Sequence, residues 1–257
     1  MKALSIAASG MLAQQHRTEV VANNLANMNT TGYQRRRTEF NNLIYRHMVR
    51  RPKVGSSPGE TVPSGVHSGL GVKLGDVYRV QEQGALKQTS NTFDLAIQGE
   101  GYFQIQLPNG DIAYTRDGTF QLNEAGQLVT HDGFPVQPGI AVPANVIDIT
   151  VNASGEVLVT QEGGAAANVG TLLLAQFQNP GGLKAVGDNM FVATDASGAA
   201  AAATPGLNGA GTVLQGFVES SNVNAIEEVS ALIRANRAYE MNSKVMKAAD
   251  EMMASRN

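Results

Sequence analysis

The sequence predicts an α+β protein: long N- and C-terminal helices that pair as a coiled coil, with a central, mainly antiparallel β domain of barrel-like or sandwich-like form. Two observations lead to this prediction. Apolar residues repeat at helical spacing at both ends of the chain, and short runs of alternating polarity, separated by turn sequences, fill the middle. The expected domains are a helical assembly domain (1–29 and 222–257), an extended connecting segment (30–71) and a β-rich body (72–221).

The C-terminal stretch carries the strongest helical signal. No Gly or Pro interrupts residues 222–257, and several alanines within it favour a helix. Apolar side chains recur there at every seventh position, at Leu232, Tyr239, Met246 and Met253. Three more lie beside this row at helical spacing: Ile226, Val229 and Ile233. A row of this kind is typical of a helix that packs against another helix.

The first thirty residues repeat the pattern. Their apolar residues occupy the a and d positions of one heptad frame: Leu4, Ala7, Met11, Val21, Leu25 and Met28. Polar residues enter both rows, at Gln14 and Thr18 near the N-terminus and at Asn236, Ser243 and Asp250 near the C-terminus. Such residues specify register and partners at a cost in stability, so we expect the apolar residues of both rows to form an assembly interface.

The connecting segment begins where the first helix should end. The sequence Asn29-Thr30-Thr31-Gly32-Tyr33 predicts that end near Asn29, because Asn and Thr side chains compete for backbone hydrogen bonds and Gly32 can adopt positive φ. A basic stretch follows, 35–53, with Glu39 as its single acid, and is expected to be a solvated face or a strip of salt bridges between subunits. Prolines and glycines in 52–75 exclude a helix, so this part should be extended, with a strand beginning near Val72.

The central body contains turn sequences at intervals that are typical of β hairpins. Turn sequences occur at Asn109-Gly110, Asp117-Gly118, 124–126 and Asp132-Gly133. Alternating runs between and after them predict strands at 102–107, 113–116, 119–122, 127–130, 146–151, 156–160, 172–177 and, more weakly, 213–218. The Ala- and Gly-rich residues 197–211 are expected to form an irregular loop. This spacing suits an antiparallel barrel or sandwich.

Composition excludes several classes of function. A net charge of −3 argues against nucleic-acid binding, which requires a basic face. The absence of cysteine removes thiolate nucleophiles, disulfides and Cys-ligated zinc. No apolar run reaches 18 residues, so we expect no membrane insertion, and polar residues within residues 3–13 argue against a cleaved signal peptide. Since none of the four histidines has a second ligand at metal spacing, we expect no catalytic, cofactor or metal site and no enzymatic activity.

Several motifs resemble those of a known family. Residues 22–33 resemble the N-terminal signature of the flagellar rod and hook proteins, and residues 237–244 resemble their C-terminal signature. Between these ends, 94–103, 114–118 and 215–223 resemble the body of the same proteins. The resemblance covers essentially the whole chain. With one modest β body, the chain is most similar to the distal rod members of that family.

The resemblance implies a homopolymer that forms a hollow shaft in the basal body and spans the periplasm. It also implies contacts with proximal rod proteins, hook protein, the surrounding rings and the flagellar type III export apparatus. Residues 55–75 resemble an insertion that the distal rod members carry and hook proteins mostly lack, and we expect it to stiffen the rod through Ser56, Pro58, Pro63 and Leu70. A proximal rod or hook subunit, and a secreted β-rich hydrolase, stay open as alternatives.

Overall fold

A computed structural model describes residues 2–43, 46–49, 66–143, 146–161 and 166–255. The chain divides into two compact units. The first unit consists of Met1–Leu25, Arg36–Tyr78 and Asn224–Asn257. The second unit consists of Ala26–Arg35 and Arg79–Val223. Each unit therefore combines segments that lie far apart in the sequence.

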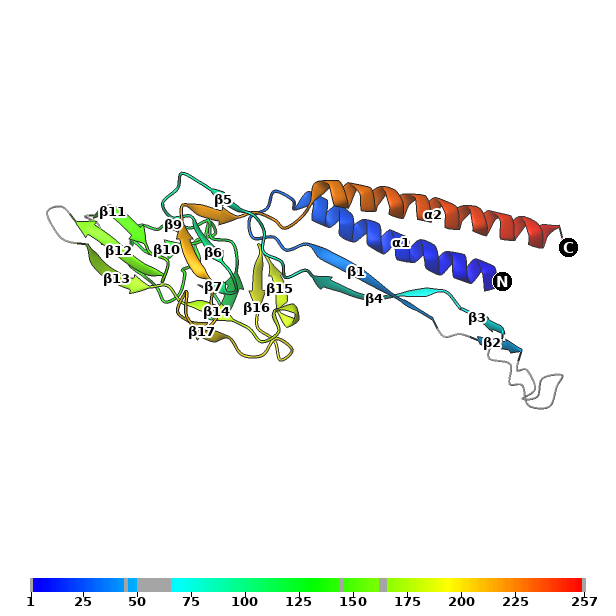
Figure 1. The fold of residues 1–257 in the computed structure, drawn as a ribbon, viewed down its shortest axis with the longest axis horizontal. Helices are drawn as coiled ribbons and strands as arrows, with labels where there is room; N and C mark the ends of the chain where they lie inside the picture. The colour runs from blue at the N-terminus through cyan, green and yellow to red at the C-terminus, as the bar shows by residue number, and fades with distance from the viewer. Residues whose placement is uncertain (1, 44–45, 50–65, 144–145, 162–165, 256–257) are drawn as a thin grey trace, which may run out of the picture. The chain divides into compact units, whose positions relative to one another are not determined.

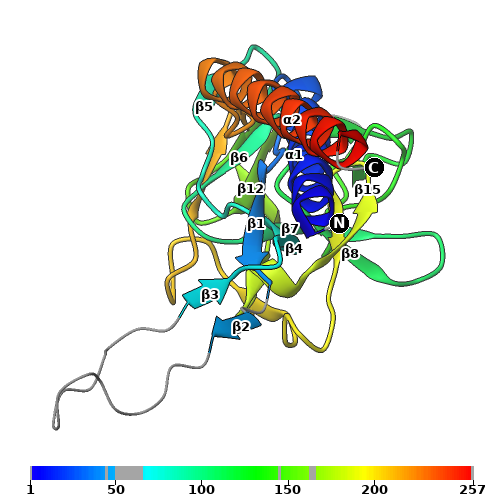
Figure 2. The same ribbon diagram turned by 90° about the vertical axis from the view of Figure 1, so that its right-hand side faces the viewer.

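The first unit contains the two long helices, α1 (Lys2–Ala26) and α2 (Ala225–Ala254). They run side by side in both views (Figures 1 and 2) and approach closely at Gly10, where an added Cβ would lie 2.8 Å from Asn242 Nδ2. The described residues of this unit also form two strand pairs, β1 (Arg36–Asn42) with β4 (Val72–Arg79) and β2 (Arg46–Val49) with β3 (Val66–Ser68).

Side-chain hydrogen bonds fix the ends of these elements. Asn224 caps α2, because its Oδ1 accepts from the backbone N–H groups of Ile226 (3.0 Å) and Glu227 (3.4 Å). The first turn of α2 also carries Glu227 and Glu228, whose negative charge suits a helix N-terminus. In the last turn of α1, buried Asn24 bonds both backbone groups of Arg36: Oδ1 accepts from its N–H (2.9 Å) and Nδ2 donates to its C=O (2.8 Å). Strand β1 is thereby fastened to α1.

The second unit is built from antiparallel strands. Its largest sheet has the order β15-β16-β8-β7-β14-β17. The strands of this sheet are β7 (Tyr102–Gln106), β8 (Ile112–Thr115), β14 (Leu174–Gln176), β15 (Lys184–Gly187), β16 (Met190–Val192) and β17 (Ala201–Ala203). A 3₁₀ turn, η1 (Pro180–Gly182), precedes β15.

The second unit also contains smaller sheets. Three strands form the order β11-β12-β13, namely β11 (Val146–Val151), β12 (Glu156–Gln161) and β13 (Ala167–Thr171). The remaining strands pair two by two: β9 (Gln121–Leu122) with β10 (Leu128–Val129), β6 (Leu95–Gln98) with β18 (Thr212–Gln215), and β5 (Leu86–Gln88) with β19 (Phe217–Glu219).

The six-stranded sheet separates two apolar clusters. Alternate residues of a strand point to opposite faces, and neighbouring residues of β7, β8, β14 and β16 accordingly enter different clusters. Phe103 packs edge-to-face on Phe120 in the larger cluster, with ring centroids 5.1 Å apart. Tyr102, Tyr114 and Phe191 belong to the smaller cluster. Because both faces of this sheet are covered, two consecutive residues of a strand can both be apolar, one for each cluster, as Tyr102 and Phe103 are.

The structure confirms the predicted α+β class, with a helix near each end and a central antiparallel β domain. The expectation of a barrel is wrong for the described residues, in which no sheet closes on itself. The Ala- and Gly-rich stretch contains a strand, β17, which pairs with β14 at the edge of the six-stranded sheet. The first helix ends at Ala26 rather than Asn29, because a turn in which the Thr30 N–H donates to the Asn27 C=O (3.2 Å) follows it.

Gly118 tests the packing of the body. An added Cβ there would overlap the Leu95 carbonyl oxygen, and the Phe103 ring lies 3.2 Å away. We expect Gly118→Ala to destabilise the full chain by about 3 kcal/mol or more, because buried backbone would have to move. Gly181→Ala is the control: its nearest neighbour is Asn179 Oδ1 at 3.3 Å, and its cost should be below about 1 kcal/mol. Urea unfolding followed by circular dichroism measures both; equal costs would contradict the described packing.

Candidate assembly surface and polar junction

The structure divides the predicted apolar row of α2 between two faces of the helix. Leu232 and Met246 are half-buried, while Ile226 is 80% exposed and Val229 and Ile233 are also exposed. The predicted residues Tyr239 and Met253 are exposed as well. Within the described chain, then, only part of the row is covered.

Helical geometry explains the division. At about 100° per residue, Ile226 and Ile233 lie roughly 160–180° around the helix from Ala235, which is completely buried. The inner face carries small side chains, including Ala235 and Ala249, and Asn242 approaches Gly10 of α1 there. Small residues permit a close approach of two backbones. Sequence reasoning treated these alanines only as helix formers, although their separation by two heptads already marked a common face of the helix.

A second exposed apolar group lies on the C-terminal half of α2. Met241, Val245 and Met252 are all more than half exposed. They lie about 60–100° around the helix from Ile226, so they form a separate patch. Sequence reasoning missed this patch because its members fall outside the seven-residue row.

The N-terminal row lies mostly inside its unit. Val21 is buried, and Leu4, Met11 and Leu25 are half-buried. Met28 is exposed and follows the end of α1. Two unpredicted residues, Ile6 and Leu12, are exposed on α1. Exposed apolar side chains therefore occur on both helices of the first unit.

The predicted stiffening segment falls only partly within the described residues. Ser56, Pro58 and Pro63 lie outside the described residues. Leu70 is described and exposed, and it is followed by Gly71 with a φ of +115°. The adjoining Val72 N–H donates to Ser9 Oγ of α1 (3.3 Å), which attaches the start of β4 to the first helix.

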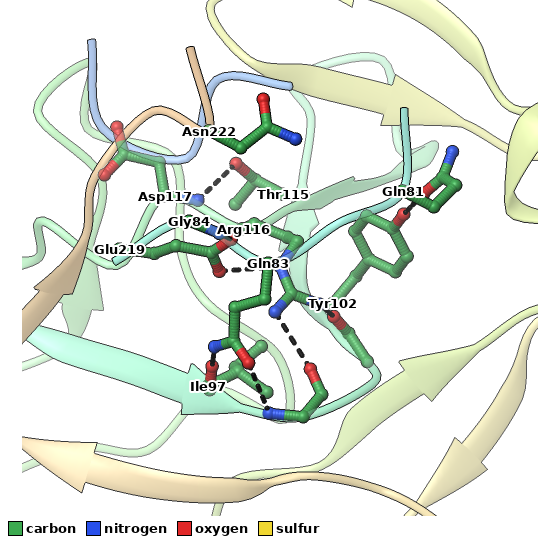
Figure 3. A network of polar contacts seen from close by, with 12 residues as sticks. Gln81, Gln83, Gly84, Ile97, Tyr102, Thr115, Arg116, Asp117, Glu219 and Asn222 are labelled. Carbon is green, nitrogen blue, oxygen red and sulfur yellow. Dashed lines mark hydrogen bonds and ion pairs between the residues drawn. The ribbon is translucent and has the colours of Figure 1, made fainter. Parts of the chain in front are cut away.

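A buried ion pair dominates the polar chemistry of the second unit (Figure 3). Arg116 Nε donates to Glu219 Oε2 at 2.8 Å, and the two residues are only 7% and 4% exposed. The remaining groups are also paired: Arg116 donates to the carbonyl oxygens of Gly101 and Gly99 (2.9 Å each), and Glu219 Oε1 accepts from the Gly84 N–H (3.0 Å). Full pairing is what offsets the cost of removing two charges from water.

The neighbouring Tyr102 completes the environment of this ion pair. Its hydroxyl donates to Gln81 Oε1 (3.2 Å), and the Arg116 guanidinium lies 5.8 Å from its ring centroid. Burial raises the pKa of the Tyr102 phenol, against smaller opposing effects from Gln34, Arg116 and Arg79. Tyr102 therefore stays neutral beside the Arg116–Glu219 pair and serves as a hydrogen-bond donor to Gln81.

In the part of the chain that the structure describes, no three His, Asp or Glu side chains gather at a distance suited to a metal ion. No described helix is both long enough and apolar enough to cross a bilayer.

Comparison with known proteins defines the class. Three family models match the chain: "Flagella basal body rod protein" at residues 4–34, "Flagellar hook protein FlgE/F/G D1 domain" at residues 96–159, and "Flagellar basal body rod FlgEFG protein C-terminal" at residues 214–257. These matches cover α1, the centre of the β unit and α2. The class is that of the rod and hook subunits of the bacterial flagellum.

Whole-chain relatives narrow the class. The flagellar basal-body rod protein FlgG of Caulobacter vibrioides is 54% identical over 98% of this chain and 97% of its own length. FlgG of Agrobacterium fabrum is 46% identical over the same shares, and FlgG of Buchnera aphidicola from Schizaphis graminum is 45% identical over 97% of this chain and 96% of its own. The chain belongs to the FlgG family of flagellar basal-body rod proteins.

The ion pair gives a prediction for the stability of the second unit. Glu219→Gln removes the charge that opposes Arg116 but keeps the shape of the side chain, so a buried cation loses its counterion. We expect a loss of about 3–5 kcal/mol in the free energy of unfolding. The matched control is Glu82→Gln, since Glu82 is 69% exposed and pairs with Arg35 at 3.1 Å. Its cost should stay below about 1 kcal/mol.

Denaturant unfolding of the full chain at neutral pH measures both variants. Equal losses for Glu219→Gln and Glu82→Gln would show that burial of the Arg116 pair has no energetic consequence.

Proposed function

We propose that this chain is a structural subunit of the distal rod of the flagellar basal body. It assembles with copies of itself into a hollow helical shaft that passes torque from the motor to the hook. The observation that carries the proposal is the exposed apolar surface of α2 in a chain that belongs to the FlgG family. Exposed apolar patches of this kind mark surfaces that bind other proteins.

The helices supply the contacts between subunits. The half-buried residues of α1 and α2 pair as a coiled coil, and the exposed residues of α2, Ile226, Val229 and Ile233 among them, pack on neighbouring copies. Contacts between unlike surfaces, repeated from copy to copy, produce an open helical filament. The exposed apolar area is then covered in the polymer rather than in the monomer.

The shaft joins other components of the flagellum. Proximal rod proteins lie at one end and hook protein at the other, ring proteins surround it, and the type III apparatus exports its subunits. The rod spans the periplasm. These assignments are supported by membership of the rod protein family.

The segment from Ser56 to Leu70 stiffens the shaft. Val66–Ser68 of this segment pair with β2 as strand β3. The residues before β3 include few apolar side chains and cannot form a core of their own, so neighbouring subunits are the surface available to them in a polymer. Such cross-connections resist the sliding between subunits that bending requires.

The assembly role of α2 predicts a specific defect. Ile233→Asp places a carboxylate on an exposed apolar face, so the free energy of unfolding of the purified chain should change by less than about 1 kcal/mol. In the polymer the same carboxylate would be buried without a partner, at a cost of several kcal/mol, and rods should not form. The control is Ile233→Leu, which keeps an apolar side chain. Electron microscopy of basal bodies and swimming assays measure the outcome; swimming by Ile233→Asp cells would overturn the assignment of this face.

The stiffening role predicts a change of shape. Deletion of 56–70 removes β3, the partner of β2, but leaves both helices and the second unit present, so export and polymerisation should continue. The polymers should be curved, in contrast to the straight rods of the full chain. Imaging of isolated basal bodies decides the matter: straight rods of normal stiffness would reduce the segment to a tolerated surface loop.

A further inference from the structure

The chain passes between its two units at four points, after residues 25, 35, 78 and 223. Each of these connections carries any force that acts between the units through the chain. A single covalent connection allows rotation about its backbone bonds, so the arrangement of the connections where they enter a unit matters. In the second unit, these entering segments are hydrogen-bonded to one another.

One side chain, Asn222, joins three of the entering segments. Its Oδ1 accepts from the Arg35 N–H at 2.7 Å, and its Nδ2 donates to the carbonyl oxygens of Val80 (3.1 Å) and Glu82 (2.9 Å). Arg35 ends the first segment of the second unit, Val80 follows the start of the next, and Asn222 itself stands one residue before the last exit. The Val80 N–H also donates to the Arg35 C=O (2.9 Å). The amide thus closes a ring of bonds across the three segments.

The buried ion pair anchors this ring to the β sheets. Glu219 precedes Asn222 by three residues and pairs with Arg116, so the exit segment is held to the interior of the unit (Figure 3). The backbone of Glu219 also accepts from the Gly32 N–H (2.8 Å), and Asn189 Nδ2 donates to the Thr31 C=O (2.7 Å). The segment that enters after α1 is therefore fixed at the same place.

We infer that Asn222, held in place by the Glu219–Arg116 pair, is a coupling residue for mechanical force. It keeps the connections of the chain at fixed spacing where they enter the second unit. A twisting force then reaches the second unit through several of these connections together, and no single connection rotates independently of the others. The inference rests on the proposed role of the chain as a torque-transmitting subunit, since only a shaft protein experiences such a force.

A purely structural role for Asn222 would look different. An asparagine that merely shapes a turn stabilises its own neighbourhood, as Asn152 does in the turn between β11 and β12. Asn152 Oδ1 accepts from the N–H groups of Ser154 (3.1 Å) and Glu156 (2.9 Å), and its Nδ2 donates to Glu156 Oε2 (2.6 Å). It makes a comparable number of bonds in the same unit, but far in sequence from every crossing point. Asn152→Ala is therefore the matched control for Asn222→Ala.

The first experiment uses the purified full chain and does not depend on the proposed function. Hydrogen exchange is measured for the amides of Arg35 and Val80 in the wild type and the two variants. We expect Asn222→Ala to accelerate both by about tenfold or more, because loss of the amide frees adjoining segments to open locally. Asn152→Ala should leave them unchanged. Unchanged exchange at Arg35 and Val80 in Asn222→Ala would overturn the inference, whatever the function of the protein.

The second experiment places the variants in flagellated cells as the sole copy of the chain. Asn222→Ala cells should build rods and swim like wild type in dilute medium, and their speed should fall by at least half relative to Asn152→Ala cells in a viscous medium. Equal speeds at high viscosity would overturn the inference. Failure of Asn222→Ala to build rods would also overturn it, since the inference requires assembly to be intact. If the wild-type chain itself formed no rods, the proposed function would fail while the exchange result still stood.

Discussion

The buried pair of Arg116 and Glu219 is the interaction on which the second unit depends. Two charges buried away from water are tolerated when each remaining polar atom has a partner. Here the partners are backbone groups of Gly84, Gly99 and Gly101. Satisfying one ion pair therefore fixes the path of several loops as well as strand β19. An apolar pair of similar volume could fill the same space, but it could not specify these backbone positions through directed bonds.

The first unit follows a different physical rule. Its helices are held by small residues and apolar contacts, and a large share of the apolar surface of α2 remains uncovered in the single chain. Apolar side chains stabilise the fold of the single chain and also provide its affinity for neighbouring subunits. The division of α2 into an inner face of alanines and outer patches of larger residues separates the two demands, since each face can change without disturbing the other.

How far the sequence determined these results depends on the range of the interactions. The helices, the Asn and Gly turns and most alternating strands were predictable because their signals lie within a few residues. The Ala-rich strand β17 was not, because it exists only through pairing with β14. Of the two forms that the sequence left open, barrel and sandwich, the barrel was wrong for the described residues, because closure of a sheet depends on long-range pairing. Arg116 looked like part of an ordinary strand end, and its partner Glu219 lies 103 residues away, so no local pattern could indicate the ion pair.

The position of Asn222 shows why such residues escape sequence reasoning and still matter. The sequence placed it in a family-like motif, 215–223, and at the start of the predicted helical domain, 222–257, and indicated no separate role for its side chain. The cap of α2 is in fact Asn224, two residues later. Asn222 is thereby released from the helix and bonds two distant segments through both ends of its amide. The amide of an asparagine supplies two N–H donors and one acceptor in one short, planar group, which matches the three bonds made here. Serine would lack the reach, and aspartate would repel the carbonyl oxygens of Val80 and Glu82, so the chemistry of the junction itself selects the residue.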